Sequence, residues 1–325
     1  FEPRALDELI PDWKEKEAPL NSPATKDIVK FTISEKSSFN IPFPSFLIPT
    51  FNNHGNYVMS LANFTRWLAT QAESLGVEIF PGFTAAEVIF EENVVKGVLT
   101  GEMGISKDGE KKPSYQPSME LRGKYTVFAE GCRGHLGKQL IKKFNLDENR
   151  DPQHYGIGFK EIWDISPEDH KEGTVMHTMG WPSNGTISGS YFYHGENNQV
   201  YLGYVVPLDY ENPHLSPFDE FQQWKQHKDI KKILEKVKRV AYGARALIKG
   251  GYQSRPKMSF PGGLLVGDNA GTLNFPKIKG THTAMKSGMI AAETIYEALQ
   301  NDSVGEDLIS YEEKFTNSWV DKELH

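Results

Sequence analysis

The chain has 325 residues, a formal net charge of −7 and a single cysteine. This length is sufficient for two domains, and the acidic balance argues against nucleic acid as a partner. One thiol excludes a disulfide framework and an iron–sulfur cluster ligated by this chain alone, and no apolar run reaches the roughly 18 residues that span a membrane. The sequence starts at Phe1 without a methionine or a signal peptide, so we expect a processed or truncated product.

The first 150 residues mix helical and strand patterns. Apolar residues recur at helical spacing over 60–75, and Gly76 ends that predicted helix. In chain order we predict helical turns at 5–13, a helix at 60–75, strands at 77–80, 85–90 and 94–99, a polar loop at 106–117, a buried strand at 125–129 and a helix at 131–144.

An uncharged segment at residues 40–51 interrupts this pattern. It carries three prolines and six large apolar side chains, and proline prevents a regular helix or a central strand. Such a loop is either folded under the protein or dipped into a membrane interface, and the sequence leaves both interpretations open.

From about residue 151 the sequence becomes β-rich. Strands are predicted at 154–163, 189–194 and 200–206, and the last two form a hairpin across residues 195–198. Helices are predicted at 218–224 and 230–240. Six lysines between 224 and 238 are interpreted as a solvated helix face, with an anionic lipid or acidic partner as the alternative.

The α/β texture returns at about 257, so we predict a discontinuous domain with a β-rich insertion. Residues 264–266 form a short buried strand that ends at Gly267 and Asp268, and a helix is predicted over 283–299. Ligands bind at the carboxyl ends of strands in open α/β sheets, and a helix start offers free N–H groups. The pattern favours a bound dinucleotide, with a flavin as the best candidate, over a structural turn.

Glu130 and Gly131 mark a second strand-to-helix turn, after the buried strand at 125–129. Small residues there let the backbone approach a cofactor closely, and the alternative is an ordinary turn with a capping glutamate. At the later helix start, we favour a hydrogen bond from Thr281 to a flavin over acid–base chemistry by His282. Cys132 has no CxxC partner and is interpreted as a small buried residue.

Four segments resemble the electron transfer flavoprotein–ubiquinone oxidoreductase family, and the similarity extends over essentially the whole chain. These segments are PDWKEK at 11–16, NHGNY at 53–57, YGARAL at 242–247 and FPKIKGTHTAMKSG at 275–288. The resemblance implies a membrane-associated respiratory-chain oxidoreductase with FAD and one 4Fe-4S cluster. Such an enzyme passes electrons from reduced electron transfer flavoprotein to ubiquinone in a bacterial or mitochondrial inner membrane.

The resemblance also implies a fold and a set of site residues. The fold is α/β, with a discontinuous Rossmann-like FAD domain of the glutathione-reductase/hydroxylase type at 1–150 and 257–325, and an inserted β-rich ubiquinone domain at 151–256. Ser188 and Gly189 correspond to a pair whose backbone meets a quinone oxygen, although the family usually has two glycines there. The 40–51 run becomes part of a membrane-facing surface. The residues assigned to FAD are Glu130, Gly131, Gly267, Asp268, Asn274, Gly280, Thr281, His282 and Thr283, with Thr281 tuning the flavin.

Two family features are missing from the sequence: the GxGxxG motif that holds the FAD pyrophosphate, and the four cysteines of the cluster. We therefore expect the central portion of such an enzyme, inactive alone, with no metal ligands and no side chain that forms a covalent intermediate. The alternatives are an FAD-dependent monooxygenase of related fold and a redox-inactive module that binds membrane surfaces.

Overall fold

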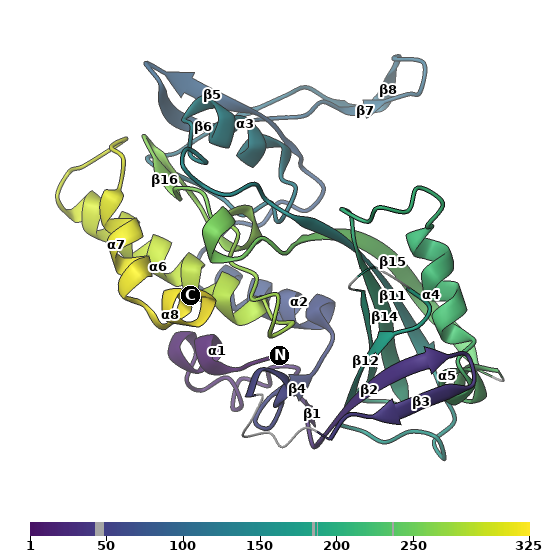
Figure 1. The fold of residues 1–325 in the computed structure, drawn as a ribbon. Helices are drawn as coiled ribbons and strands as arrows, with labels where there is room; N and C mark the ends of the chain where they lie inside the picture. The colour runs from purple at the N-terminus through teal and green to yellow at the C-terminus, as the bar shows by residue number, and fades with distance from the viewer. Residues whose placement is uncertain (43–48, 184–185, 187, 236) are drawn as a thin grey trace. The chain divides into compact units, whose positions relative to one another are not determined.

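The computed structural model describes residues 1–42, 49–183, 186, 188–235 and 237–325 (Figure 1). It is mixed α/β and divides into two compact units. Unit 1 comprises Phe1–Gln71, Gln153–Lys249 and Phe275–His282, and unit 2 comprises Ala72–Pro152, Gly250–Asn274 and Thr283–His325. Residues 1–71 thus group with the β-rich middle of the chain, whereas the sequence pattern grouped them with the flanking α/β portions.

Unit 1 contains a seven-stranded sheet in the order β15-β11-β14-β13-β12-β2-β3. Neighbouring strands are antiparallel except β12 and β2, which are parallel. The strands are β2 (Lys26–Ser34), β3 (Ser37–Asn40), β11 (Tyr155–Asp164), β12 (Thr174–Gly180), β13 (Gly189–His194), β14 (Gln199–Pro207) and β15 (Lys238–Ile248). Further elements of the first 74 residues are α1 (Arg4–Leu9), β1 (Ser22–Pro23), η1 (Pro49–Phe51), β4 (Tyr57–Val58) and α2 (Leu61–Ser74).

One face of this sheet packs against α4 (Pro217–Lys225) and α5 (Lys228–Leu234). Ser216 caps α4 by accepting a hydrogen bond from the Asp219 N–H, and Pro217 occupies the first helical position, where its missing N–H costs nothing. Alternate residues of β13 and β14 bury their side chains under α4, and Trp224 is fully buried there. The indole N–H of Trp224 donates to the hydroxyl of Thr178 at 2.9 Å, so its one polar atom is satisfied.

A buried carboxylate fixes the end of α4 to the sheet. Both oxygens of Glu161 accept from the Lys225 ammonium at 2.9 Å, and Oε1 also accepts from Arg239 at 3.0 Å. The Trp163 indole donates to Oε2 at 2.8 Å. The side chains of Glu161 and Lys225 are 3% and 11% exposed, so Lys225 does not belong to a solvated lysine face.

Unit 2 is built around a short mixed sheet in the order β10-β17-β16. Its core combines Phe128 and Leu264 of this sheet with Leu140 of α3 and Ile290 of α6. The elements are β5 (Ala85–Glu91), β6 (Val94–Thr100), β7 (Met103–Ile105), β8 (Lys111–Gln116), β9 (Glu120–Arg122), β10 (Thr126–Phe128), α3 (His135–Lys143), η2 (Tyr252–Ser254), β16 (Ser259–Phe260), β17 (Gly263–Leu265), η3 (Gly267–Asn269), α7 (Ile309–Asn317), α8 (Trp319–Leu324) and most of α6 (Thr281–Gln300).

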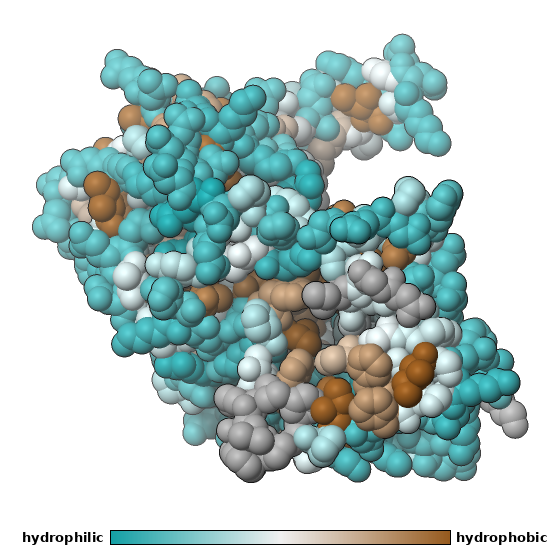
Figure 2. All heavy atoms as spheres, viewed as in Figure 1, coloured by the Kyte–Doolittle hydropathy of each residue, from teal (hydrophilic) through white to brown (hydrophobic). Residues whose placement is uncertain are grey.

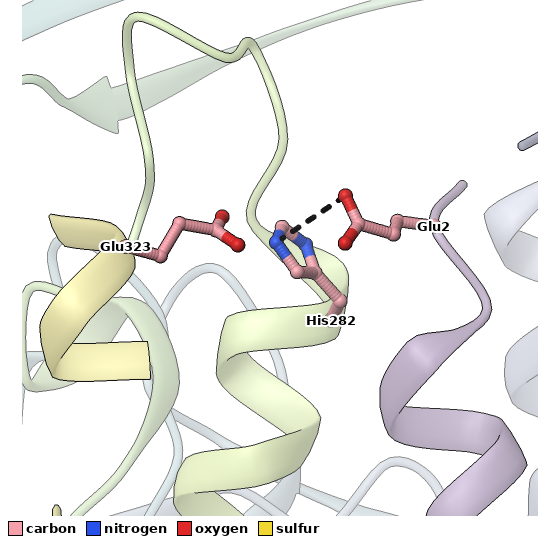
Figure 3. Close-up of side chains that lie close together, drawn as sticks. All are labelled: Glu2, His282 and Glu323. Atoms are coloured by element: carbon pink, nitrogen blue, oxygen red, sulfur yellow. Dashed lines mark ion pairs between the residues drawn. The ribbon is translucent and has the colours of Figure 1, made fainter. Parts of the chain in front are cut away.

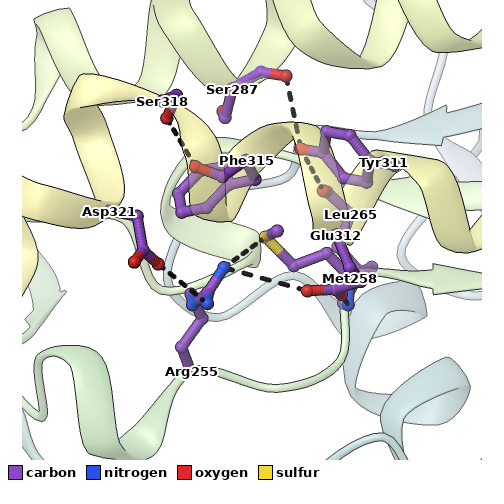
Figure 4. A network of polar contacts seen from close by, with 9 residues as sticks. All are labelled: Arg255, Met258, Leu265, Ser287, Tyr311, Glu312, Phe315, Ser318 and Asp321. Atoms are coloured by element: carbon purple, nitrogen blue, oxygen red, sulfur yellow. Dashed lines mark hydrogen bonds and ion pairs between the residues drawn. The ribbon is translucent and has the colours of Figure 1, made fainter.

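A buried arginine in the segment before β16 contacts both C-terminal helices, α7 and α8 (Figure 4). Arg255, 4% exposed, donates to Asp321 of α8 at 3.2 Å and lies 3.9 Å from Glu312 of α7. Its guanidinium stacks 4.5 Å from the centre of the Phe315 ring. The planar guanidinium of arginine can stack on a ring and donate several hydrogen bonds at once. The ammonium group of lysine, at the end of a flexible side chain, suits this position less well.

Replacing Arg255 with Lys is expected to lower the free energy of unfolding by about 1.5–3 kcal/mol, the range for a hydrogen bond to a charged group. Lysine keeps the charge but loses the stacked plane and the fork of donors. Urea unfolding followed by circular dichroism measures the change. Arg245→Lys, on β15 of unit 1, is the control, and equal stability of the Arg255→Lys chain contradicts the assignment.

The structure confirms strands at 85–90, 94–99 and 125–129, and the hairpin of β13 and β14. Three predictions are wrong. Residues 77–80 form no strand, the loop at 106–117 contains β8, and the helix predicted at 230–240 ends at Leu234, with β15 starting at Lys238. Whether a segment forms a strand depends on a neighbouring strand that can be distant in the sequence. A short local pattern carries no information about that neighbour.

Candidate functional site

Two strands of unit 2 bring the predicted cofactor turns to the same sheet edge. β10 and β17 are parallel neighbours, with Val127 opposite Leu264. Glu130 and Gly131 follow β10, and Gly267 and Asp268 follow β17. Because the carboxyl ends of neighbouring parallel strands meet at one edge, the two turns lie together where open α/β sheets bind ligands.

The backbone at this edge is tightly arranged. Gly131 has a φ of 82° and Gly267 a φ of 59°, conformations that favour glycine. The Gly267 N–H donates to the Ser287 hydroxyl of α6 at 2.8 Å. A side chain at Gly137 would collide with the Asn269 amide, so α3 approaches this turn as closely as only glycine permits.

The carboxylate of Glu130 caps α3. It accepts from the Gly137 N–H at 2.7 Å and from the Leu136 N–H at 3.4 Å. This is the capping role that the sequence left open as an alternative, and free N–H groups at a helix start favour it. A cofactor contact by Glu130 and Gly131 remains a prediction.

The other predicted cofactor residues of unit 2 differ in their surroundings. Asp268 is half-buried, and Thr283 is fully buried in the first turn of α6. The Asn274 amide donates to the Glu323 carboxylate at 3.1 Å. Asn274 therefore anchors α8, and its contact with FAD stays a prediction.

Unit 1 contains a cavity of about 280 Å³ on the sheet face opposite α4. Alternate residues of β12, β13 and β14 point into it, and the segment 277–281 lies across it. The cavity is lined by Phe1, Ala24, Asn53, Asn56, Tyr57, Val58, Met59, Lys160, Val175, His177, Tyr191, Tyr193, Tyr201, Lys277, Ile278, Lys279 and Thr281.

Ile278 in the lining has a φ of 56°. A β-branched residue in this left-handed region is a true outlier that costs about 1–3 kcal/mol, and such strain clusters at functional sites. Thr281 lines the same cavity, and Gly280 is half-buried next to it. The segment with this strained backbone therefore includes Thr281, the residue predicted to tune the flavin, in the cavity wall.

A histidine and three tyrosines dominate the sheet side of the cavity. The Nε2 of His177 lies 2.7 Å from the hydroxyl of Tyr193, and the Tyr191 and Tyr193 rings stack at 4.8 Å. Burial lowers the pKa of His177 to about 4, with the Lys279 ammonium contributing, and burial raises the pKa of both tyrosines. The sequence analysis missed these residues, although the alternation in the predicted strand at 189–194 places Tyr191 and Tyr193 on one face.

His282 lies next to the cavity but does not line it. Its side chain is 1% exposed, and Nε2 lies 3.8 Å from the Glu2 carboxylate, which also pairs with Lys277 at 2.7 Å (Figure 3). A buried histidine beside a carboxylate is typical of a packing and orienting role. A hydrogen bond from Thr281 to a flavin, favoured over acid–base chemistry by His282, stays a prediction.

Ser188 and Gly189 lie at the start of β13. The Ser188 hydroxyl lies 2.9 Å from the hydroxyl of Tyr204, on the α4 side of the sheet. Gly189 alternates with Tyr191 and Tyr193 and therefore lies on the cavity face of the strand. Ser188 has no positive φ, so its backbone needs no glycine.

The central part of the apolar 40–51 run, residues 43–48, lies outside the described residues. The neighbouring β2 and β3 expose Phe31, Ile33 and Phe39, which are 38%, 58% and 53% accessible. Figure 2 shows apolar side chains gathered over these two strands. Among the described residues, no helix combines the length and the apolar character needed to span a membrane.

Cys132, interpreted from the sequence as a small buried residue, is half-buried in the structure.

Comparison with known proteins gives specific matches. Residues 155–247, from β11 into β15, match the family model described as ETF-QO, ubiquinone-binding. Over its full length the chain is 59% identical to electron transfer flavoprotein-ubiquinone oxidoreductase from Pseudomonas aeruginosa and 53% identical to the mitochondrial protein of that name from Sus scrofa. It covers 59% and 54% of those relatives, so it spans little more than half of their length.

Solved structures establish the fold. A geranylgeranyl bacteriochlorophyll reductase-like protein from Thermoplasma acidophilum matches with a TM-score of 0.67 at 16% identity, over 93% of this chain and 68% of that one. A flavin-dependent brominase matches with a TM-score of 0.60 at 17% identity, over 97% and 71%. The chain therefore has the mixed α/β, Rossmann-like fold of flavin-dependent proteins, as predicted.

Proposed function

We propose that this chain is the central portion of an electron transfer flavoprotein–ubiquinone oxidoreductase. The full-length protein would pass electrons from reduced electron transfer flavoprotein, through a flavin, to ubiquinone. The observation that carries this proposal is the match of residues 155–247 to a ubiquinone-binding family model. These residues supply Lys160, Val175, His177, Tyr191, Tyr193 and Tyr201 of the unit 1 cavity. The aromatic side chains of this lining suit a quinone ring, and its polar groups can meet the quinone oxygens.

For FAD we propose contacts from the two strand-end turns of unit 2 and from the α6 start. The flavin dependence of structural neighbours supports a flavin on this fold. The proposed residues are Glu130, Gly131, Gly267, Asp268, Asn274, Gly280, Thr281, His282 and Thr283. Bound FAD supplies the redox chemistry, and these residues bind and orient it. Ser188 and Gly189 are proposed to meet a quinone oxygen through their backbone.

The remaining parts of the proposal concern regions and partners outside this chain. We propose one 4Fe-4S cluster in the full-length protein, electron transfer flavoprotein as the donor, and a location at the bacterial or mitochondrial inner membrane. The exposed Phe31, Ile33 and Phe39 support contact with a membrane surface. The names of the mammalian relatives include the word mitochondrial, which fits this location.

The test uses the full-length, FAD-loaded protein. Reduced electron transfer flavoprotein is mixed with it and with ubiquinone-1, and quinol formation is followed by absorbance. We expect quinol only when all three are present, and no oxidation of NADPH. Flavin reduction by NADPH would instead identify a monooxygenase.

The purified 325-residue chain is expected to bind FAD weakly or not at all. It contains no GxGxxG motif to hold the pyrophosphate, and that contact supplies much of the affinity in this fold. Equilibrium dialysis, read at the flavin absorbance band, measures binding for the chain and for the full-length protein as control. Tight, stoichiometric FAD in the chain contradicts this expectation.

A further inference from the structure

We propose that Tyr193 and His177 form a proton relay that protonates a quinone as it is reduced in the unit 1 cavity. The inference rests on the proposed function and adds the source of the protons. Reduction of a quinone to a quinol takes two electrons, here from the reduced flavin, and two protons. Each carbonyl oxygen gains one O–H bond, so a proton donor within reach of the ring is required.

The geometry places such a donor in the cavity wall. Tyr193 and His177 come from neighbouring strands β13 and β12, in which Tyr193 pairs with Val175 and His177 pairs with Tyr191. The two side chains are therefore diagonal neighbours on one face, and 2.7 Å separates the phenol oxygen from Nε2. Both residues line the cavity, and the proposal places one carbonyl oxygen of a quinone bound there at the Tyr193 hydroxyl.

The protonation states suit a relay. Burial keeps the phenol of Tyr193 protonated and the imidazole of His177 neutral near pH 7. A neutral imidazole donates from one nitrogen and accepts at the other. Tyr193 transfers its proton to the quinone oxygen, His177 transfers the Nε2 proton to the tyrosine oxygen, and a proton from solvent binds at Nδ1. The O–H bond formed on the quinone replaces that of Tyr193, and the O–H bond re-formed on Tyr193 replaces the Nε2–H bond of His177. The second quinone oxygen takes its proton from solvent, so the quinol that forms is neutral and no charge stays buried.

The charged and titratable groups around the pair come from four further positions. Asp27 of β2 lies near Tyr193, and Lys279 of the lining segment lies near His177. Tyr191 of β13 and Lys160 of β11 complete the wall. Asp27 is held by the amide and the backbone N–H of Asn53, at 2.6 and 2.9 Å. Asp27 contributes to the raised pKa of Tyr193 and Lys279 to the lowered pKa of His177, so both groups favour the neutral forms of the pair.

The test compares two acceptors in the full-length, FAD-loaded protein. After stoichiometric reduction of the flavin, its reoxidation is followed by stopped-flow absorbance with ubiquinone-1, which takes up protons, and with ferricenium, which takes only electrons. Tyr193→Phe and His177→Gln are expected to slow reoxidation by ubiquinone-1 about 10²–10⁴-fold, the usual contribution of a positioned acid, with the ferricenium rate unchanged. Tyr242→Phe, an exposed tyrosine of β15 that does not line the cavity, is the control and keeps both rates.

The outcomes separate the relay from the function. An active wild-type protein with unchanged ubiquinone-1 rates in both variants overturns the relay alone. Equal slowing with both acceptors also overturns it, because that result indicates a disturbed flavin. A raised KM for ubiquinone-1 with unchanged kcat assigns the pair to binding and overturns proton delivery. A wild-type protein that reduces ferricenium but not ubiquinone-1 overturns both the relay and the proposed function.

Discussion

Replacing Glu161 with Gln is expected to lower the free energy of unfolding by about 3–5 kcal/mol, the range observed when one partner of a buried ion pair is removed. Both carboxylate oxygens accept: Oε1 from Lys225 and Arg239, and Oε2 from Lys225 and Trp163. In glutamine an NH₂ group replaces one of these two oxygens. In either orientation of the amide, that NH₂ group faces N–H donors instead of accepting from them. The Lys225 ammonium, 11% exposed, then loses its counter-charge where water cannot replace it.

Urea unfolding followed by circular dichroism measures this loss. Arg239→Gln is the matched control, because its side chain is 44% exposed and its pair with Glu161 contributes about 1 kcal/mol or less. Replacing Glu161 and Lys225 together with Met is expected to recover much of the stability, since the one charge left without its partner, on Arg239, is 44% exposed and hydrated. Equal losses for Glu161→Gln and Arg239→Gln contradict the assignment of Glu161 as the anchor of α4.

Acidification from pH 6.5 to pH 4 is expected to remove about 3 kcal/mol of stability for each of two buried histidines. Burial lowers the pKa of His177 and of His194 from 6.5 to about 4, and one pKa unit corresponds to about 1.4 kcal/mol. Between these values the unfolded chain binds more protons than the folded chain, so stability rises with pH. The contribution is complete above pH 6.5 and is lost as the pH falls to about 4.

Two substitutions that keep the neutral hydrogen bonds test this prediction. His194→Asn retains an acceptor for the Lys171 N–H, which now donates to Nδ1 at 3.1 Å, and His177→Gln retains a partner for Tyr193. Unfolding midpoints measured from pH 4 to pH 7 are expected to depend less on pH in the double variant. A pH dependence as steep as that of the unmodified chain would falsify the role of these histidines.

Several elements follow directly from local sequence. The Ser216-Pro217 start of α4, the alternation in β13 and the hairpin across residues 195–198 each depend on neighbours within a few residues. The same holds for the strand that ends at Gly267 and Asp268. Side-chain period and the special backbone freedom of glycine are local properties, so a single sequence reveals them.

The resemblance to the electron transfer flavoprotein–ubiquinone oxidoreductase family, too, follows from sequence alone. Long, specific segments such as residues 275–288 carry the resemblance, and the full-length identities of 53–59% agree with it. The assignment of the turns at Glu130 and Gly267 to one FAD requires the two buried strands before them to lie close together, and β10 and β17 are parallel neighbours. What those turns bind remains the subject of the proposed experiments.

Only the tertiary structure decided which distant segments share a sheet. β2 pairs with β12 across about half the chain, which joins residues 1–71 to the β-rich middle. That pairing, with the path of residues 277–281, creates the cavity in which His177 meets Tyr193. Local periodicity indicates which face of a sheet a residue occupies, but not which strand lies beside its own. The pairing of strands depends on the burial of side chains summed over the whole sheet.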